Sequence, residues 1–178
     1  MTADEVVRFW REAGREKWFA KDEAFDAACR TRFGAAWERA AAGAFDAWAE
    51  TPEGALGLVI LLDQIPRNVF RRDPRTWAAD AKALAVAERA VERGFDREVA
   101  ADLRAFFYLP FEHAEDRRAQ ARSLDLFAAL GDPEFLHWAR HHHDIVMRFG
   151  RFPHRNAVLG RDSTPEELAF LEEDSFRG

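Results

Sequence analysis

Apolar residues recur at helical spacing along most of this chain. Between Asp22 and Gly43 they fall on one face of a 3.6-residue helix, the pattern of an amphipathic segment. Asp22 suits the N-cap of that helix, and Gly43 suits its C-terminal stop. The predicted apolar face consists of Phe25, Ala28, Cys29, Phe33, Ala36 and Trp37.

A second helix is predicted to begin after Thr51, which suits an N-cap, with Pro52 at the first helical position. From Ala55 to Leu62 the sequence is apolar on every face of the helix. A helix of this kind is expected to lie at the centre of the core.

The proline at position 66 predicts where this second helix ends. Ile65 precedes Pro66, and the residue before a proline is disfavoured in the α conformation. The helix is therefore predicted to end near Asp63 or Gln64.

Further helical segments follow, separated by short connectors. No segment has the alternation typical of a strand, and no linker rich in serine and glycine divides the chain. The predicted fold is all-α: a single compact helical domain over residues 1–178, built of antiparallel helix hairpins. The additional helices are predicted at Thr76–Glu92, Asp96–Tyr108, Glu115–Leu130, Pro133–Phe149 and Pro165–Glu173.

The composition narrows the class of function. A chain of 178 residues with 48% hydrophobic content can bury an ordinary core without disulfides. Its single cysteine, Cys29, excludes an internal disulfide and a multi-cysteine zinc site. The net charge of −6 and the pI near 5.6 argue against a general nucleic-acid binder.

No membrane or targeting segment is evident. The longest apolar run, Ala55–Leu62, is far shorter than the ~20 residues that span a bilayer. The N-terminal stretch "MTADEVVRFW" contains acids and no long apolar core, unlike a signal peptide. We therefore expect a cytoplasmic protein without a membrane partner, and the sequence leaves its oligomeric state undetermined.

One short pattern occurs twice, each time after an apolar helix. The stretches "DQIPRNVFR" (Asp63–Arg71) and "GRFPHRNAVLGR" (Gly150–Arg161) share a large hydrophobic residue, proline, arginine and asparagine, and the second inserts His154. Forked guanidinium groups suit carboxylate or phosphate, although ordinary turns and internal ion pairs explain the pattern equally well. The clustered arginines are Arg67, Arg71, Arg72, Arg148, Arg151, Arg155 and Arg161.

The segment Pro133–Phe149 carries histidines on two faces. His142 lies on the apolar stripe, where an imidazole is either a hydrogen-bonded core residue or part of a pocket. His137, His141 and Asp144 share another face at a spacing that can ligate a metal, but surface helices often have such combinations. We therefore expect no metal site and no cofactor.

The stretch "LPFEHAED" places Glu112 beside His113 at a predicted helix start marked by Pro110. A carboxylate can orient an imidazole or raise its pKa, which prepares acid/base chemistry or anion binding. The structural alternative is an acidic first turn that complements the helix dipole.

Several stretches together resemble the bacterial domain-of-unknown-function family 924. They are "RFW", "WFAKDEAFD", "LDQIPRNVFR", "LPFEHAED" and, above all, the long "RFGRFPHRNAVLGR". The resemblance covers nearly the whole chain and implies a single all-α domain of the tetratricopeptide-like superfamily, without an established activity. Ala114 departs from the serine expected there. The family pattern matches at Asp63, Gln64, Pro66, Arg67, Asn68, Glu112, His113, Glu115, His142, Arg148, Arg151, His154, Arg155, Asn156 and Arg161.

We expect both Pro-Arg-Asn segments and the "FEH" stretch to meet in one cleft lined by arginine, histidine and asparagine. The predicted cleft binds a small anionic molecule, a carboxylate or a phosphate, with His113 and His154 as candidate acid/base catalysts. The candidate ligand-binding residues are Asp63, Arg67, Asn68, Glu112, His142, Arg151, Arg155, Asn156 and Arg161.

Two alternatives come from other classes of protein. A tetratricopeptide-like module would grip a peptide carboxylate or a protein partner without catalysis. Alternatively, the same residues form a purely structural polar network that binds nothing and is costly to break.

Overall fold

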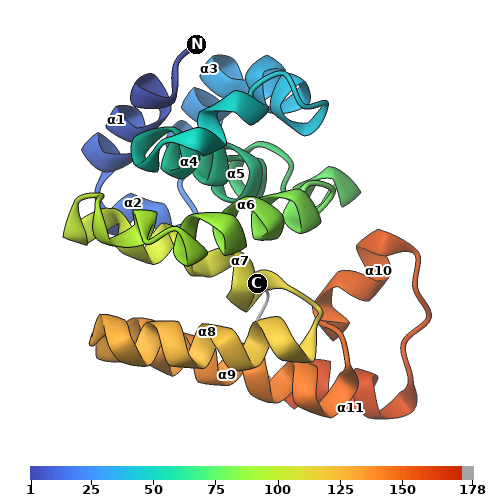
Figure 1. The fold of residues 1–178 in the computed structure, drawn as a ribbon. Helices are drawn as coiled ribbons and strands as arrows, with labels where there is room; N and C mark the ends of the chain where they lie inside the picture. The colour runs from blue at the N-terminus through green and yellow to red at the C-terminus, as the bar shows by residue number, and fades with distance from the viewer. Residues whose placement is uncertain (174–178) are drawn as a thin grey trace. The chain divides into compact units, whose positions relative to one another are not determined.

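The computed structural model describes residues 1–173, and every regular element in that part of the chain is a helix (Figure 1). The all-α prediction is confirmed. The chain groups into two compact units: unit 1 comprises residues 1–71 and 75–110, and unit 2 comprises residues 72–74 and the chain from Phe111 onward. The single domain over residues 1–178 and the tetratricopeptide-like arrangement stay predictions.

The longer helices of unit 1 are α1 (Ala3–Ala13), α3 (Glu23–Ala41) and α6 (Asp80–Glu92), and its other helical segments are short. Helix α7 (Leu109–His113) begins in unit 1 and continues into unit 2. The preceding elements are α1 (Ala3–Ala13), α2 (Arg15–Trp18), α3 (Glu23–Ala41), η1 (Asp46–Glu50), α4 (Pro52–Val59), η2 (Ile60–Gln64), α5 (Ile65–Val69), η3 (Pro74–Thr76), α6 (Asp80–Glu92), η4 (Phe95–Arg97) and η5 (Ala101–Phe107).

Helix α3 has the predicted cap and most of the predicted apolar face. The Asp22 carboxylate accepts hydrogen bonds from the backbone N–H groups of Ala24 and Phe25, which satisfies two unpaired donors of the first turn. Ala28 is exposed, so the stripe is narrower than predicted. Its buried members are Phe25, Cys29, Phe33, Ala36 and Trp37.

Helix α4 lies at the centre of unit 1, as its uniformly apolar sequence predicts. It begins after Thr51, whose hydroxyl accepts a hydrogen bond from the Gly54 N–H. Its glycines permit close packing: a Cβ added at Gly57 would lie 2.8 Å from the Cβ of Ala3 in α1. The fully buried apolar side chains between Ala55 and Leu62 are Ala55, Leu56, Leu58, Val59, Ile60, Leu61 and Leu62.

The predicted helix end near Asp63 or Gln64 is wrong. The chain stays helical through Pro66 to Val69, and Ile65 has α-region angles of φ −54° and ψ −44°. The π-helical turn η2 makes this possible, because Ile65 donates its N–H to the carbonyl of Ile60, five residues back. The widened turn moves the carbonyl four residues before Pro66, which would otherwise clash with the proline ring.

The predicted helices Thr76–Glu92 and Asp96–Tyr108 are only partly correct. The first begins later, at Asp80, and the second is replaced by the 3₁₀ segments η4 and η5. Asp96 explains part of this difference, since its carboxylate accepts from the Tyr108 hydroxyl at 2.6 Å and its carbonyl accepts from Arg104. These contacts of Asp96 stabilise 3₁₀ turns, which are tighter than the α-helical turns that the apolar spacing predicts.

Unit 2 is built on a hairpin of two long helices, α8 (Arg117–Leu130) and α9 (Pro133–Phe149), which lie side by side in Figure 1. Gly131, in the left-handed conformation at φ 78°, ends α8. Asp132 then caps α9 by accepting from two backbone N–H groups. The chain continues through η6 (Pro153–Arg155), α10 (Asn156–Leu159) and α11 (Pro165–Glu173).

The α9 and α11 boundaries match the predictions, and α8 begins two residues later than predicted because Asp116 is its N-cap. A small apolar core forms where α9 meets the following turn. It consists of Ile145, Val146 and Phe152, with Phe149 and Phe170 packed against it. Across residues 1–173, no helix has both the length and the apolar character that crossing a bilayer requires.

Candidate functional site

In unit 1, the first Pro-Arg-Asn segment is held by acidic side chains. Asp63 is fully buried in η2, and its carboxylate lies 3.3 Å from the Arg67 guanidinium and 2.6 Å from the Gln64 amide nitrogen. Arg67 also donates to both carboxylate oxygens of Asp80, at 3.1 and 3.0 Å. The buried charge of Asp63 is thus paired within the same unit, as buried charges generally must be.

Asn68 and Arg71 share another buried acid, Asp26 of α3. Asn68 donates its amide to Asp26 Oδ1 at 2.9 Å, and Arg71 donates to both oxygens of the same carboxylate. The Asn68 hydrogen bond links α5 to α3, and the bidentate Arg71 pair links the residues just after α5 to the same helix. Nothing in the sequence indicates Asp26 and Asp80 as members of this network, because their partners lie 45 and 13 residues away and leave no local pattern.

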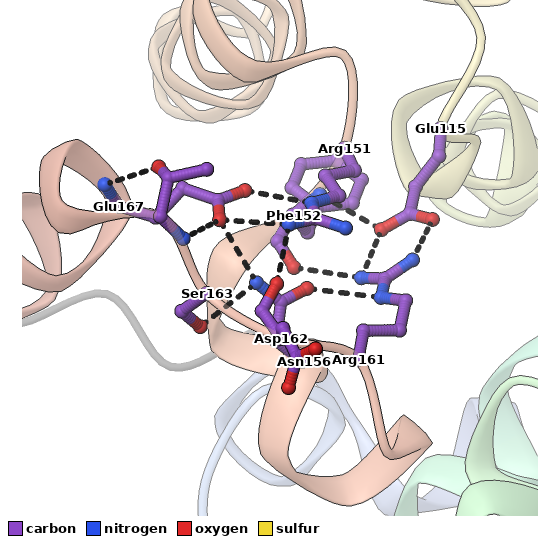
Figure 2. Close-up of polar contacts among 9 residues, drawn as sticks. Glu115, Arg151, Phe152, Asn156, Arg161, Asp162, Ser163 and Glu167 are labelled. Atoms are coloured by element: carbon purple, nitrogen blue, oxygen red, sulfur yellow. Dashed lines mark hydrogen bonds and ion pairs between the residues drawn. The ribbon is translucent and has the colours of Figure 1, made fainter.

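In unit 2, the second segment is enclosed by the interactions drawn in Figure 2. Arg161 forms a bidentate pair with Glu115, at 2.6 and 2.9 Å, and Glu115 also accepts from the Phe152 N–H at 2.8 Å. Burial raises the pKa of the Glu115 carboxyl, but the hydrogen bonds from Arg161 and Phe152 outweigh it and leave this pKa below its usual value.

Arg151 makes a second bidentate pair, with Glu167 of α11, at 2.7 and 2.8 Å. Glu167 also accepts from the Thr164 N–H and from the Asn156 amide, although its side chain is almost completely buried. The hydrogen bonds from Arg151 lower the pKa of Glu167 to about 2. Asn156 receives one more contact, because its side-chain oxygen accepts from Arg161 at 2.9 Å.

We call these interactions of Glu115, Arg151, Asn156, Arg161 and Glu167 the arginine clasp. The clasp links three parts of unit 2: the residues just before α8, the turn that follows α9, and helix α11. It therefore fixes the path of the chain beyond the α8–α9 hairpin. The Glu167 carboxylate accepts the paired N–H donors of Arg151, and the Glu115 carboxylate accepts those of Arg161. Three of the predicted ligand-binding residues, Arg151, Asn156 and Arg161, therefore bind other side chains of the protein itself.

A different kind of cluster lies at the end of α7. His142 of α9 is buried, and its Nδ1 lies 2.9 Å from the Trp138 carbonyl and 3.2 Å from the Glu112 carboxylate. His113 is half-buried, and its ring centroid is 6.1 Å from that of His142. We call Glu112, His113 and His142 the Glu-His-His cluster.

Burial lowers the pKa of His142 well below its usual range, and the neighbouring His113 adds to this effect. His142 is therefore neutral near pH 7. Its Nδ1 faces two acceptors, the Trp138 carbonyl and the Glu112 carboxylate, so the ring proton belongs on Nδ1 and Nε2 retains its lone pair.

Two residues hold the cluster from outside. Gln120 of α8 donates its side-chain amide to the carbonyls of Glu112 and Ala114, at 2.6 and 2.8 Å, which fixes the last turn of α7. Arg155 of η6 donates to the His113 carbonyl at 3.0 Å, and its guanidinium lies 4.5 Å from the Phe152 ring centroid. Gln120 was also missed by the sequence analysis.

The predicted site residues are thus distributed over three groups. The structure brings Glu112, His113, His142 and Arg155 together in unit 2, and His154 packs its ring against Phe152 at 5.7 Å. The clasp holds Arg151, Asn156 and Arg161. The remaining three, Asp63, Arg67 and Asn68, lie in unit 1, so their convergence with the others in one cleft stays a prediction.

The exposed face of α9 does not form the metal-ligating set considered from sequence. In the described residues, the one group with metal-site geometry is the Glu-His-His cluster, whose ligand atoms all lie within 4.8 Å of one another. The Asp144 carboxylate instead contacts His143 at 3.0 Å, while His137 and His141 flank the ring of Trp138.

These features define an all-helical protein with a buried polar cluster between α7 and α9. The profile of the family described as "Bacterial protein of unknown function (DUF924)" matches residues 6–175, and the chain belongs to this family. It is also similar to the solved structure of a protein of unknown function from Agrobacterium tumefaciens, with 50% identity, a TM-score of 0.92 and 97% of each chain covered. The curated proteins give no match.

Proposed function

We propose that the protein binds a small anionic molecule, a carboxylate or a phosphate, beside the Glu-His-His cluster, with Arg155 recognising the negative charge. The observation that carries this proposal is the convergence of Arg155 with two imidazoles. Arg155 reaches the end of α7 from η6, and the rings of His113 and His142 are 6.1 Å apart at the same place.

The electrostatics of the cluster support an anion. Arg155 is only 6% exposed, and a charge removed from water acts more strongly on its surroundings than one at the surface. His113 and Arg155 both contribute to the lowered pKa of His142, after burial. The charge of Arg155 favours a negatively charged ligand beside these rings.

The orientation of Arg155 supports recognition by shape as well as charge. Its guanidinium packs on the Phe152 ring and is bonded to the His113 carbonyl, so its plane has one preferred orientation. A fixed planar fork suits the geometry of carboxylate and phosphate, and little entropy is lost when such a ligand binds.

A structural role suits the remaining arginines better than ligand binding. Arg67, Arg151 and Arg161 each form bidentate pairs with carboxylates of their own unit. An added anion would have to displace those carboxylates. We therefore assign the clasp and the Asp63–Arg67 network to the scaffold, and the proposed ligand site to the Glu-His-His cluster with Arg155.

Thermal unfolding in the presence of EDTA tests this proposal with inorganic phosphate and succinate as probes. At 100 times Kd a ligand stabilises the folded state by about 2.7 kcal/mol, which is a shift of several degrees in Tm. We expect Arg155→Lys, which keeps the charge but loses the fork, to weaken that shift strongly.

The matched control is Arg140→Lys, on the exposed face of α9, which should keep the wild-type shift. An equal shift in Arg155→Lys and wild type, or no shift of wild type with either anion, would reject the proposal. A shift produced only by peptides ending in a free carboxylate would favour the peptide-binding alternative instead.

Proton transfer by His113 or His154 is a separate prediction. If a reaction is found, replacing the catalytic imidazole should remove turnover while the affinity for the anion is largely kept. Loss of affinity and turnover together would indicate a binding role.

A further inference from the structure

We infer that Glu112, His113 and His142 form a binding site for one divalent transition-metal ion. This inference goes beyond the proposed anion site and does not depend on it. It also departs from the expectation of no metal drawn from the sequence, because His142 lies 29 residues after His113 and only the fold brings it to the adjacent Glu112 and His113.

The ligand set suits a borderline metal ion. Two imidazoles and one carboxylate are typical ligands of Zn²⁺, Co²⁺ and Fe²⁺, whereas Mg²⁺ and Ca²⁺ prefer oxygen atoms throughout. One ligand atom from each side chain can be chosen so that all three lie within 4.8 Å of one another. Ligands bonded to one ion at about 2.0–2.2 Å are closer than that, so modest side-chain rotation completes the site.

The surroundings of His142 match those of a metal-binding histidine. Such residues commonly donate one ring N–H to a carbonyl or a carboxylate, which fixes the tautomer and leaves the other nitrogen for the metal. Here Nδ1 contacts the Trp138 carbonyl and Glu112 Oε1. A carboxylate has two oxygens, so contact through Oε1 is compatible with metal ligation by Glu112 through Oε2.

The backbone that carries the other two ligands is also held in place. Gln120 binds the carbonyls on either side of His113, and Arg155 binds the carbonyl of His113 itself. These contacts restrict the end of α7, where Glu112 and His113 are adjacent. Restricted ligands lose less entropy when an ion binds them.

The three ligands differ in exposure, which indicates an open site. Glu112 and His142 are buried at 3% and 7% exposure, whereas His113 is half-buried. Three protein ligands with one solvent-facing side leave a coordination position for water or another small molecule, as in catalytic rather than structural zinc sites. The nearby charge of Arg155 favours an anion as that fourth ligand.

Cobalt provides a direct test, because Co²⁺ bound to nitrogen and oxygen ligands gives visible absorption bands that report its coordination. Tag-free protein freed of metal with EDTA and then exchanged into chelator-free buffer would be titrated with Co²⁺, and with Zn²⁺ by calorimetry. We expect one equivalent to bind, and we expect His113→Ala and Glu112→Gln each to lower the affinity at least tenfold while circular dichroism stays native.

The matched control is His137→Ala, an exposed histidine of α9 that should leave binding unchanged. His142→Ala would add information only if it folds, so His113→Ala and Glu112→Gln decide the outcome. The inference is wrong if wild type binds no stoichiometric ion, if His113→Ala binds as well as wild type, or if His137→Ala abolishes the cobalt bands.

The anion and metal experiments have separate outcomes. Anion binding in EDTA without cobalt binding would support the proposed function and reject the metal site. Stoichiometric cobalt binding without any anion shift would do the reverse. A metal bound by His113 would also remove that imidazole from the proton-transfer role predicted for it.

Discussion

The two Pro-Arg-Asn segments have similar sequences and opposite local structures. In unit 1, Ile65 before the proline is helical, and the chain continues from α4 through η2 into α5. In unit 2, Gly150 ends α9 in the left-handed conformation, and Phe152 before the proline is extended, at φ −94° and ψ 107°. The steric rule for residues before proline is therefore obeyed in one copy and overridden in the other.

Backbone hydrogen bonding in one copy and a glycine in the other explain the difference between the copies. The residues of η2 are all buried, and a helical path keeps their backbone groups bonded where no water can reach them. The second copy begins with the exposed Gly150, which adopts the left-handed conformation at little cost and so ends α9 before Phe152. The partners of the arginines differ as well: Arg67 is paired with acids, whereas Arg155 lies against the Glu-His-His cluster.

The largest effect is expected from removing the buried acid of the first copy. Asp63→Ala leaves the Arg67 guanidinium and the Gln64 amide without this carboxylate, and breaking a buried pair in this way costs about 3–5 kcal/mol. Urea denaturation followed by circular dichroism measures the loss.

The control for that variant is Asp102→Ala, which removes the exposed Arg11–Asp102 pair of the same unit and should cost under about 1 kcal/mol. Equal effects of the two substitutions would show that the Asp63 network contributes no more than a surface ion pair.

The second effect is the pH dependence of the clasp. The folded-state pKa of Glu167 is lowered from 4.5 to about 2, so its contribution is complete above about pH 5 and is lost as the pH falls towards 2. At 1.36 kcal/mol per pKa unit this amounts to at most about 3 kcal/mol, because solvent around Arg151 screens part of the attraction. Glu115 contributes in the same direction.

Comparison with Glu167→Gln isolates that contribution. The variant should be less stable than wild type at pH 7, and the difference should shrink as the pH falls below 4. A difference that stays constant from pH 7 to pH 2.5 would mean that the Arg151–Glu167 pair does not stabilise unit 2 through charge.

The smallest effect concerns the glycine that ends α9. Gly150 has φ 73° and no neighbour within 4 Å of an added Cβ, so Gly150→Ala should cost only the backbone strain of about 1–2 kcal/mol. Gly34→Ala, inside α3 with equally open space, should instead stabilise by up to about 1 kcal/mol. If thermal unfolding showed that both substitutions stabilise the protein, or that both destabilise it, the roles assigned to the two glycines would be contradicted.

The sequence predicts much of this fold, because most of its helices have local signals. The caps at Asp22 and Thr51 and the boundaries Pro133–Phe149 and Pro165–Glu173 follow from residues within a few positions of each other. The π-helical turn before Pro66 does not follow from nearby residues, because it depends on burial by the rest of unit 1.

The candidate site is less predictable for the same reason. Arg151 and Arg161 are conspicuous in the sequence, but their partners Glu167 and Glu115 are identified only by folding, at separations of 16 and 46 residues. His142 was placed correctly on the core-facing side by periodicity. Its neighbours Glu112 and His113 lie on another helix, and no short-range sequence pattern links them to His142.

We assign Arg155 to a ligand site, and Arg151 and Arg161 to the scaffold. Nuclear magnetic resonance of the arginine Nε–H groups tests this assignment in a single titration with inorganic phosphate or succinate, with EDTA present. We expect saturable shifts at Arg155 and at the His113 and His142 rings, and only small changes at Arg151 and Arg161. Equal shifts at all three arginines, or none at Arg155 when the others respond, would contradict it.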